Sequence, residues 1–179
     1  IYVETKLAPE DIVKTVGDRV RDSFAVDAVT ISLYHQQESS VERVYMYDVA
    51  QPVVKLGVWP LGKGLASTVI RTRRPLILGS AQEAEQHGAV FPGPAAARGK
   101  PTEAYLGVPI IVGDRVLGVV AVHSYRQNAF DESNVRLLST LASNMGVAIE
   151  NARLFAETQR LLAETELRAG DLATINSVG

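Results

Sequence analysis

Histidine and cysteine usage limits the chemistry that this chain could perform. It has three histidines, His35, His87 and His123, and no cysteine. Disulfides, thiolate zinc sites, cysteine nucleophiles and thioether-linked cofactors are therefore excluded. Glu83 and His87 stand four residues apart, a spacing that can hold a metal ion on a helix, but no third ligand accompanies them. We therefore interpret this pair as an exposed ion pair and predict no metal site.

His123 is the histidine best placed for a binding site. It ends an apolar strand and shares the alternation of that strand's apolar residues. Two interpretations stay open: a strand-end histidine hydrogen-bonded to backbone, or a polar group at the edge of a pocket. His35, beside the polar run QQESS, and His87, in a loop-rich segment, are expected to be exposed.

No arrangement of residues indicates catalysis. A cluster of three arginines, Arg71, Arg73 and Arg74, could bind an anion. Such a cluster more often interacts with the negative C-terminal end of a helix. The sequence contains no Ser-His-Asp set, phosphate-binding loop or paired carboxylates in a recognisable context. We therefore predict that the protein is not an enzyme, and keep an enzyme with an unfamiliar site only as a third hypothesis.

Composition predicts a globular domain with an ordinary core. The chain has 179 residues, 46% of them hydrophobic, and a net charge of -2 without a block of one sign. This charge gives no electrostatic reason to expect nucleic acid or an acidic membrane as a partner. No apolar run is long enough to cross a membrane. The chain opens at Ile1 without a signal peptide, so we expect a cytoplasmic piece of a longer protein.

Hydrophobic periodicity predicts an α+β fold with one central antiparallel sheet and helices on both sides. The expected helices are 8–24, 62–74 and 130–155, with a helical turn at 81–87. The expected strands are 27–35, 41–49, 53–61, 75–78 and the two apolar runs on either side of Gly113-Asp114 within 103–125. Gly113-Asp114 suits a two-residue type II′ turn between two strands covered on both faces. Asp131 is the expected N-cap of the last helix, but Asn134 is neither Glu nor Gln, so we expect no proper capping box. Residues 79–102, rich in Gly and Pro, are typical of a binding loop or lid.

Three segments together resemble a family of small-molecule sensors. GKGLASTVIRTRRPLIL, YLGVPIIVGDRVLGVVAVHSY and FDESNVRLLSTLASNMGVAIENARLF resemble a GAF domain, of the kind found in tandem in bacterial histidine kinases and nucleotide cyclases. The resemblance covers roughly residues 9–155. It implies a GAF/PAS-like six-stranded sheet, with the first and last helices on one face and a ligand pocket on the other, under 79–102. The expected organisation is the end of a preceding connector (1–8), the sensor domain (9–150) and a helical connector to a next domain (151–179).

The residues of this chain exclude or disfavour several of the ligands that the resemblance implies. Covalent bilin attachment and free methionine sulfoxide reduction both use cysteine in this family, and this chain has none. The cyclic-nucleotide signature is matched here only at Phe130, because His123-Ser124 and Asn134-Val135 replace its Asn-Lys and Asp-Glu pairs. This weakens a cyclic nucleotide as the ligand without excluding it. Heme through His87 is disfavoured, so no cofactor is predicted.

The pocket itself is predicted from residue type and place. Ligand sites are mostly apolar with a few placed polar groups. The candidate ligand-binding residues are Trp59, Leu65, Phe91, Tyr105 and His123. A role of Trp59 as a plain core or lid anchor is an equal alternative.

The C-terminal stretch predicts a helix that leaves the domain and pairs with a second copy. Two series recur every seven residues: one is Leu141, Ala148, Phe155, Leu162 and Ala169, and the other is Leu138, Met145, Ala152, Gln159 and Glu166. Gly170 is expected to end the helix or form a joint. We therefore predict a homodimeric sensor that relays the binding of an unidentified small molecule to a downstream kinase or cyclase domain. A ligand-free scaffold that only dimerises is the alternative.

Overall fold

The computed structural model describes residues 9–50, 57–90 and 101–178. In chain order its elements are α1 (Pro9–Ser23), β1 (Ala28–His35), β2 (Ser40–Asp48), β3 (Gly57–Pro60), α2 (Leu65–Thr72), β4 (Leu76–Leu78), α3 (Ala81–Gln86), β5 (Ala104–Val112), β6 (Arg115–Ser124) and α4 (Glu132–Ser177). This order matches the predicted one. The first residues of the predicted strand 53–61 lie outside the described residues, as does part of the predicted lid.

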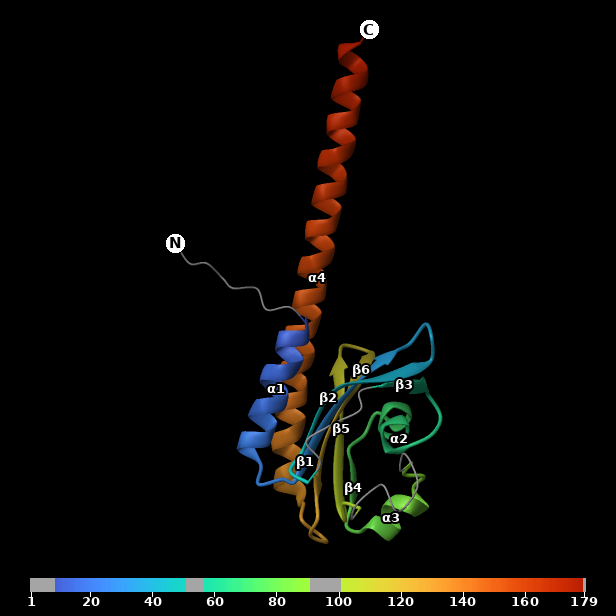
Figure 1. The fold of residues 1–179 in the computed structure, drawn as a ribbon, viewed down its shortest axis with the longest axis vertical. Coiled ribbons are helices and arrows are strands. Elements are labelled where there is room, and N and C mark those ends of the chain that lie inside the picture. The colour runs from blue at the N-terminus through green and yellow to red at the C-terminus, as the bar shows by residue number, and fades with distance from the viewer. Residues whose placement is uncertain (1–8, 51–56, 91–100, 179) are drawn as a thin grey trace.

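Six strands form one antiparallel sheet in the order β3-β2-β1-β6-β5-β4. Helices α1 and α4 pack on one face of the sheet, and α2 and α3 lie over the other (Figure 1). The predicted α+β class, the six strands and the covering of both faces are confirmed. None of the helices in the described ranges is long and apolar enough to cross a membrane.

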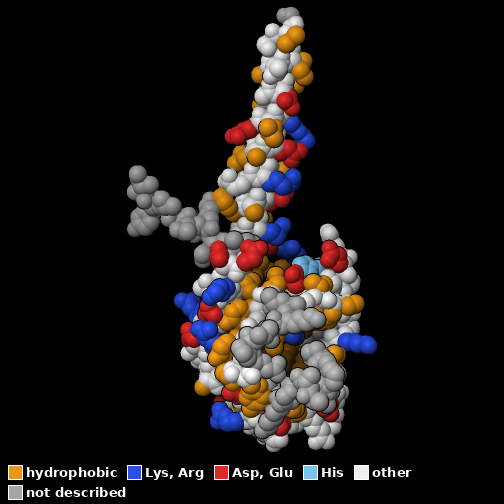
Figure 2. Space-filling model, in the orientation of Figure 1, with side chains coloured by type: hydrophobic (Ala, Val, Ile, Leu, Met, Phe, Trp, Pro, Cys, Tyr) orange, Lys and Arg blue, Asp and Glu red, His pale blue; other side chains and the backbone are white. Residues whose placement is uncertain are grey.

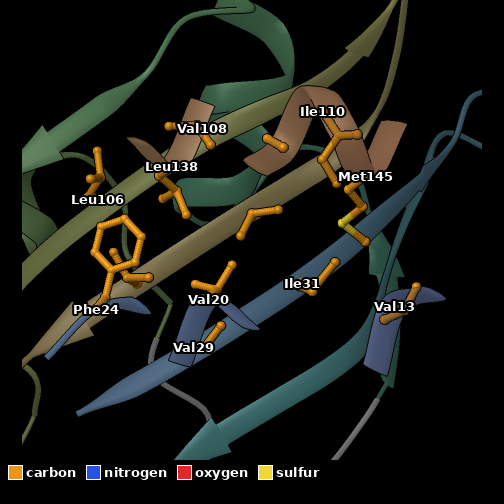
Figure 3. Packing of buried hydrophobic residues seen from close by; sticks show 13 residues of the cluster. Val13, Val20, Phe24, Val29, Ile31, Leu106, Val108, Ile110, Leu138 and Met145 are labelled. Carbon is orange, nitrogen blue, oxygen red and sulfur yellow. The ribbon is translucent and has the colours of Figure 1, made fainter. Parts of the chain in front are cut away.

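A first core cluster fills the space between the sheet, α1 and α4 (Figure 3). It includes Val20 of α1, Ile31 of β1, Leu106 of β5, and Leu138 and Met145 of α4, none of which keeps any exposed surface. Burying one such side chain contributes about 1.5–3 kcal/mol. The first part of α4 is therefore an integral part of the domain core.

A second core cluster lies between the sheet, α2 and α3. Its buried members include Val41 of β2, Val69 of α2, Leu78 of β4, Tyr105 of β5 and Ala121 of β6. Strands β5 and β6 send alternate residues to the two clusters, which confirms that both strands are covered on both faces. The two-residue turn between them has Gly113 at a φ of 58°, as a type II′ turn requires.

Helix α4 begins with a complete capping box. The Asp131 carboxylate accepts hydrogen bonds from the N–H groups of Ser133 (2.8 Å) and Asn134 (3.1 Å). The Asn134 side-chain oxygen accepts from the Asp131 N–H at 2.9 Å. Asp131 is thus confirmed as the N-cap, but the expectation that no capping box forms is wrong. The amide oxygen of Asn performs the acceptor role that Glu or Gln usually fills.

Helix α4 continues without a break for 46 residues and projects far beyond the body (Figure 1). Gly170 lies within it, so the expectation that Gly170 ends the helix or forms a joint is wrong. A glycine costs about 1 kcal/mol relative to alanine inside a helix. The helical hydrogen bonds on both sides, with ion pairs such as Arg168–Glu164 at 2.6 Å, offset that cost.

Candidate functional site

The candidate site lies on the α2 face of the sheet, where β5 and β6 pair Tyr105 with His123. The two rings meet edge to face, with centroids 5.2 Å apart and planes at 74°. Because β-strand residues alternate between faces, His123 points to the same side as Ala121 and Val119 of the second core cluster. The site therefore belongs to the face opposite α1 and α4.

His123 is held between two threonines. Its Nε2 lies 3.5 Å from the Thr30 hydroxyl and its Nδ1 lies 3.5 Å from the Thr102 hydroxyl. Burial, with a smaller contribution from the positive charge of Arg43, lowers the pKa of His123 to about 4. The imidazole is therefore neutral at physiological pH. His123 therefore contacts threonine side chains, and its place at the edge of a pocket stays a prediction.

Arg43 of β2 is the charged residue of the site, and the sequence prediction missed it. Its guanidinium carbon lies 5.0 Å from the centroid of the Trp59 ring, and its Nη1 lies 3.8 Å from the Met46 sulfur. Its Nε is buried and has no hydrogen-bond partner in the part of the chain that the structure describes. Burial lowers the pKa of Arg43, but an arginine stays protonated in proteins. No ion pair within the described ranges includes Arg43.

Tyr105 supplies a second buried polar atom without a partner. The residue is 5% exposed, and its hydroxyl makes no hydrogen bond among the described residues. Its ring runs along its own strand over Gly107, where an added Cβ would collide with the ring. Burial raises the pKa of Tyr105, so the hydroxyl stays protonated and can donate. We call the set Arg43, Trp59, Tyr105 and His123 the Arg43–Tyr105 site.

Small side chains cover the sheet beside the Arg43–Tyr105 site. Gly107 pairs with Ala121, which in turn pairs with Thr30 across β6 and β1. In the next row, Ser32 of β1 lies opposite Arg43. These short side chains keep bulk away from the two unpaired polar atoms.

Four of the five predicted ligand-binding residues gather on this face. Trp59, Leu65 and Tyr105 belong to or pack against the second core cluster, and His123 packs on Tyr105. Phe91 lies outside the described residues. The role of these residues in ligand binding stays a prediction.

A signal in the sequence could have found Arg43. Period-two alternation puts Arg43 on the same face as Val41, which is fully buried. A register shift between Ile31 and Ser32 of β1 then turns Tyr45 to the other face, which masks the pattern.

The other chemistry-bearing groups are engaged in structural contacts. No group of three potential metal ligands occurs in the described ranges of the chain. His87 approaches the backbone carbonyl of Glu83 with its Nδ1 at 2.9 Å, while the Glu83 carboxylate accepts from the Gly79 N–H at 2.7 Å. The predicted Glu83–His87 ion pair is therefore wrong, because both side chains form hydrogen bonds with backbone groups instead.

A polar junction joins the sheet to α4. The Glu150 carboxylate lies 2.6 Å from Arg115 of β6 and 3.0 Å from Arg153 of α4. The hydrogen bond from Arg153 lowers the pKa of Glu150, and the charge of Arg115 adds to this effect. A groove of about 370 Å³ lies beside the junction, lined by residues 34–38 and 115–117 with Arg153. On the α2 side, Arg73 donates to the carbonyl oxygen of Asp114 in the β5–β6 turn at 2.8 Å.

Comparison with known proteins finds a matching family model and a longer related protein. A sequence model of the GAF domain family matches residues 6–150. The circadian input-output histidine kinase CikA of Thermosynechococcus vestitus is 26% identical over 180 residues, which cover 94% of this chain and 24% of the kinase. This chain therefore spans about a quarter of the length of that relative.

Solved structures share the fold at low sequence identity. The GAF domain of an Acinetobacter phosphoenolpyruvate-protein phosphotransferase matches with a TM-score of 0.70 and 22% identity, covering 84% of this chain and 87% of that one. The free methionine-R-sulfoxide reductase from Neisseria meningitidis matches with a TM-score of 0.68 and 16% identity, covering 84% and 83%. At these identities the likeness shows the fold alone. Because the family model accounts for residues 6–150, this chain belongs to the GAF domain family.

Proposed function

We propose that this chain is a non-catalytic small-molecule sensor and dimerisation module of a bacterial signal-transduction protein. The observation that carries the proposal is the construction of α4. Leu138 and Met145 of this helix have no exposed surface, whereas its last turns project into solvent as one continuous helix. A shift in the packing of the core would therefore move the projecting part as a lever.

A chain of contacts links the cover of the candidate site to this lever. Helix α2, which packs on the second core cluster, ends at Thr72 with Arg73 as its C-cap, and Arg73 donates to the carbonyl oxygen of Asp114. The next residue, Arg115, pairs with Glu150 of α4. A ligand that repositions α2 would act on α4 through this turn and the polar junction.

The projecting helix carries an apolar stripe that suits pairing with a second copy. Val147, Leu154 and Leu161 follow one another at seven-residue spacing, and Leu172 and Ile175 continue on the same side. All five are 48–69% exposed. Hydrophobic side chains are visible along this part of α4, between charged ones (Figure 2). An isolated helix of this kind is marginal in water, so a partner helix supports it.

Near the body of the domain, the residues of the two predicted seven-residue series are already buried or partly buried. Leu138 and Met145 are fully buried, and Leu141, Ala148 and Phe155 are partly buried. We therefore place the dimer contact on the Val147–Leu154–Leu161 side of α4. The proposed output is a downstream kinase or cyclase domain, by analogy with the longer histidine kinase that this chain resembles.

The alternative is a ligand-free scaffold that only dimerises. The α4 stripe favours this hypothesis as much as the sensor, because pairing needs no ligand. An enzyme is the least supported hypothesis. A reductase shares the fold, but thiol chemistry would need a cysteine, and this chain has none.

Native mass spectrometry of the purified chain, compared with its denatured spectrum, tests the proposal. A dimer that carries an additional small mass, released on denaturation, is the result that a sensor predicts. A dimer without additional mass favours the scaffold. A monomer without bound mass contradicts both parts of the proposal.

A further inference from the structure

We propose that the Arg43–Tyr105 site binds a small monocarboxylate with an apolar body. The carboxylate would lie against the Arg43 guanidinium and the Tyr105 hydroxyl, with its apolar part on the second core cluster. This inference rests on the proposed sensor function and names the class of its ligand. Two buried polar atoms, Arg43 Nε and Tyr105 Oη, have no hydrogen-bond partner among the described residues.

Arg43 makes no ion pair among the described residues. Its side chain is partly exposed, but its Nε is buried, and a buried donor of a charged group is costly unless it is hydrogen-bonded. The acids nearest to Arg43 along β2 are engaged elsewhere, since Glu42 contacts His35 at 2.8 Å and Asp48 accepts from Tyr125 at 3.1 Å. The sequence of 51–56 and 91–100, the internal segments outside the described residues, contains neither Asp nor Glu. The missing counter-charge is therefore expected to come from a ligand.

Tyr105 provides a donor on the same face of the sheet as this charge. Ser32, which lies opposite Arg43, pairs with Val119 of β6, and Gly107, under the Tyr105 ring, pairs with Ala121 of β6. Val119 and Ala121 both belong to the second core cluster, so Arg43 and the Tyr105 ring occupy adjacent rows of this face. A carboxylate has two oxygens with lone pairs for several donors, so one group can satisfy the guanidinium and the hydroxyl together.

The charge of the site selects a monoanion. His123 is neutral, because burial lowers its pKa to about 4, so Arg43 is the one charge in the Arg43–Tyr105 site. A carboxylate carries a single negative charge, whereas a phosphate monoester carries about -1.5 to -2 at pH 7. The planar guanidinium also matches the geometry of a carboxylate.

The residues around the proposed carboxylate position favour a ligand whose remaining part is apolar. Trp59 holds the guanidinium over its ring at 5.0 Å, and Val69 and Ala121 of the second core cluster are buried nearby on the same face. Apolar surface with a few placed polar groups is the usual composition of a small-molecule site. A linear or aromatic monocarboxylate meets both requirements, and hexanoate and phenylacetate represent the two shapes.

The test uses matched probes on the 179-residue chain. Hexanoate and phenylacetate are titrated by calorimetry, alongside the neutral hexanamide and phenylacetamide and the more highly charged hexyl phosphate. Trp59 is the one tryptophan of the chain and contacts Arg43, so its fluorescence reports hexanoate binding directly. The carboxylates are expected to bind at least tenfold more tightly than their amides. Titration to about 10 mM would nearly saturate a site with a dissociation constant of about 1 mM.

Three variants separate the anion contact from general stability. Arg43→Met removes the charge and keeps the length of the side chain, and is expected to weaken carboxylate binding about 10- to 100-fold. Tyr105→Phe removes only the hydroxyl and keeps the packing, and is expected to weaken it about tenfold. Arg19→Met changes an exposed arginine of α1, on the other face of the sheet, and is expected to leave binding unchanged. Tyr105→Phe still decides the question if Arg43→Met fails to fold.

Specific outcomes overturn the inference. Equal binding of carboxylates and amides, no binding of either up to about 10 mM, or tighter binding of hexyl phosphate would each reject a monocarboxylate. A small mass that co-purifies equally with native protein and with Arg43→Met would reject the anion contact and leave the sensor function standing. A native spectrum without any bound mass, together with no probe binding, would reject the sensor function as well.

Discussion

The apolar stripe on α4 yields a quantitative prediction for the double substitution Leu154→Ala and Leu161→Ala. The two leucines keep 49% and 48% of their surface exposed in the single chain. If α4 pairs with a second copy along this stripe, these exposed halves become buried. The double variant should then dissociate, while each monomer keeps its fold, because alanine is at least as good a helix former as leucine.

The magnitude follows from the buried carbon atoms. Each substitution removes three carbons, worth about 0.8 kcal/mol apiece on full burial. Because about half of each side chain is newly buried in the dimer, one leucine contributes about 1.2 kcal/mol. A symmetric dimer contains both leucines twice, so the double variant should lose about 5 kcal/mol of dimerisation free energy. This corresponds to an increase of roughly three orders of magnitude in the dissociation constant.

Sedimentation equilibrium over a range of concentrations measures this constant. Leu167→Ala is the matched control, because Leu167 is 71% exposed but lies on the opposite side of α4. It should dimerise like the native chain. Circular dichroism of the Leu167→Ala control should match that of the native chain, whereas the dissociated double variant should lose helix content only in the projecting part of α4.

Three results would refute the reasoning. The native chain could stay monomeric at every concentration, which would leave the stripe without a partner helix. The double variant could dimerise as tightly as the native chain, which would place the contact elsewhere. The Leu167→Ala control could weaken dimerisation equally, which would indicate an interface without a preferred side.

Three further predictions concern the body of the domain. Between pH 6.5 and about 4, the unfolded chain binds a proton at His123, whereas the folded chain, in which the pKa of His123 is about 4, does not. Urea titrations should therefore show that the free energy of unfolding falls by about 3 kcal/mol as the pH drops through this range. His123→Asn should remove most of that fall. Gly118→Ala should cost about 3 kcal/mol or more, because its Cβ would meet the backbone carbonyl of Ser32, whereas Gly170→Ala, with open surroundings, should gain about 1 kcal/mol; equal urea midpoints would contradict this contrast. Glu150→Gln removes the carboxylate shared by two arginines, so hydrogen exchange of residues 147–155 should accelerate, and unchanged exchange would show that the polar junction does not hold α4.

The sequence predicted the fold well where local signals and burial agree. Two apolar runs around Gly113-Asp114 define a hairpin at the sheet centre, and the turn has the φ angle that this pair favours. The spacing of Leu138 and Met145 likewise marks the buried side of α4. In each case the hydrophobic period and the turn or cap chemistry indicate the same structure.

The sequence predicted less where one residue type can serve two purposes. Asn134 closes a capping box although the usual rule names Glu or Gln, because its amide oxygen is an equivalent acceptor. Gly170 indicates a helix end, but the intrahelical contacts on both sides outweigh its cost.

The candidate site shows the same limit. Trp59, Tyr105 and His123 were predicted from their apolar or strand-end positions, and they come together on one face. Arg43 was missed because an arginine in a hairpin strand usually faces solvent. Its inward direction depends on the strand register, which places it opposite Ser32, and register is a tertiary property.

The most direct test of the central claim measures whether occupancy of the Arg43–Tyr105 site moves α4. The chain has no cysteine, so Ala163→Cys introduces a unique spin-label position on the exposed part of this helix. Electron–electron distance measurements on the labelled dimer would compare protein stripped of small molecules with protein saturated by hexanoate. The account predicts a shift in the inter-helix distance distribution that is absent when Arg43→Met is added. An identical distribution with and without bound carboxylate would contradict the relay and leave a scaffold.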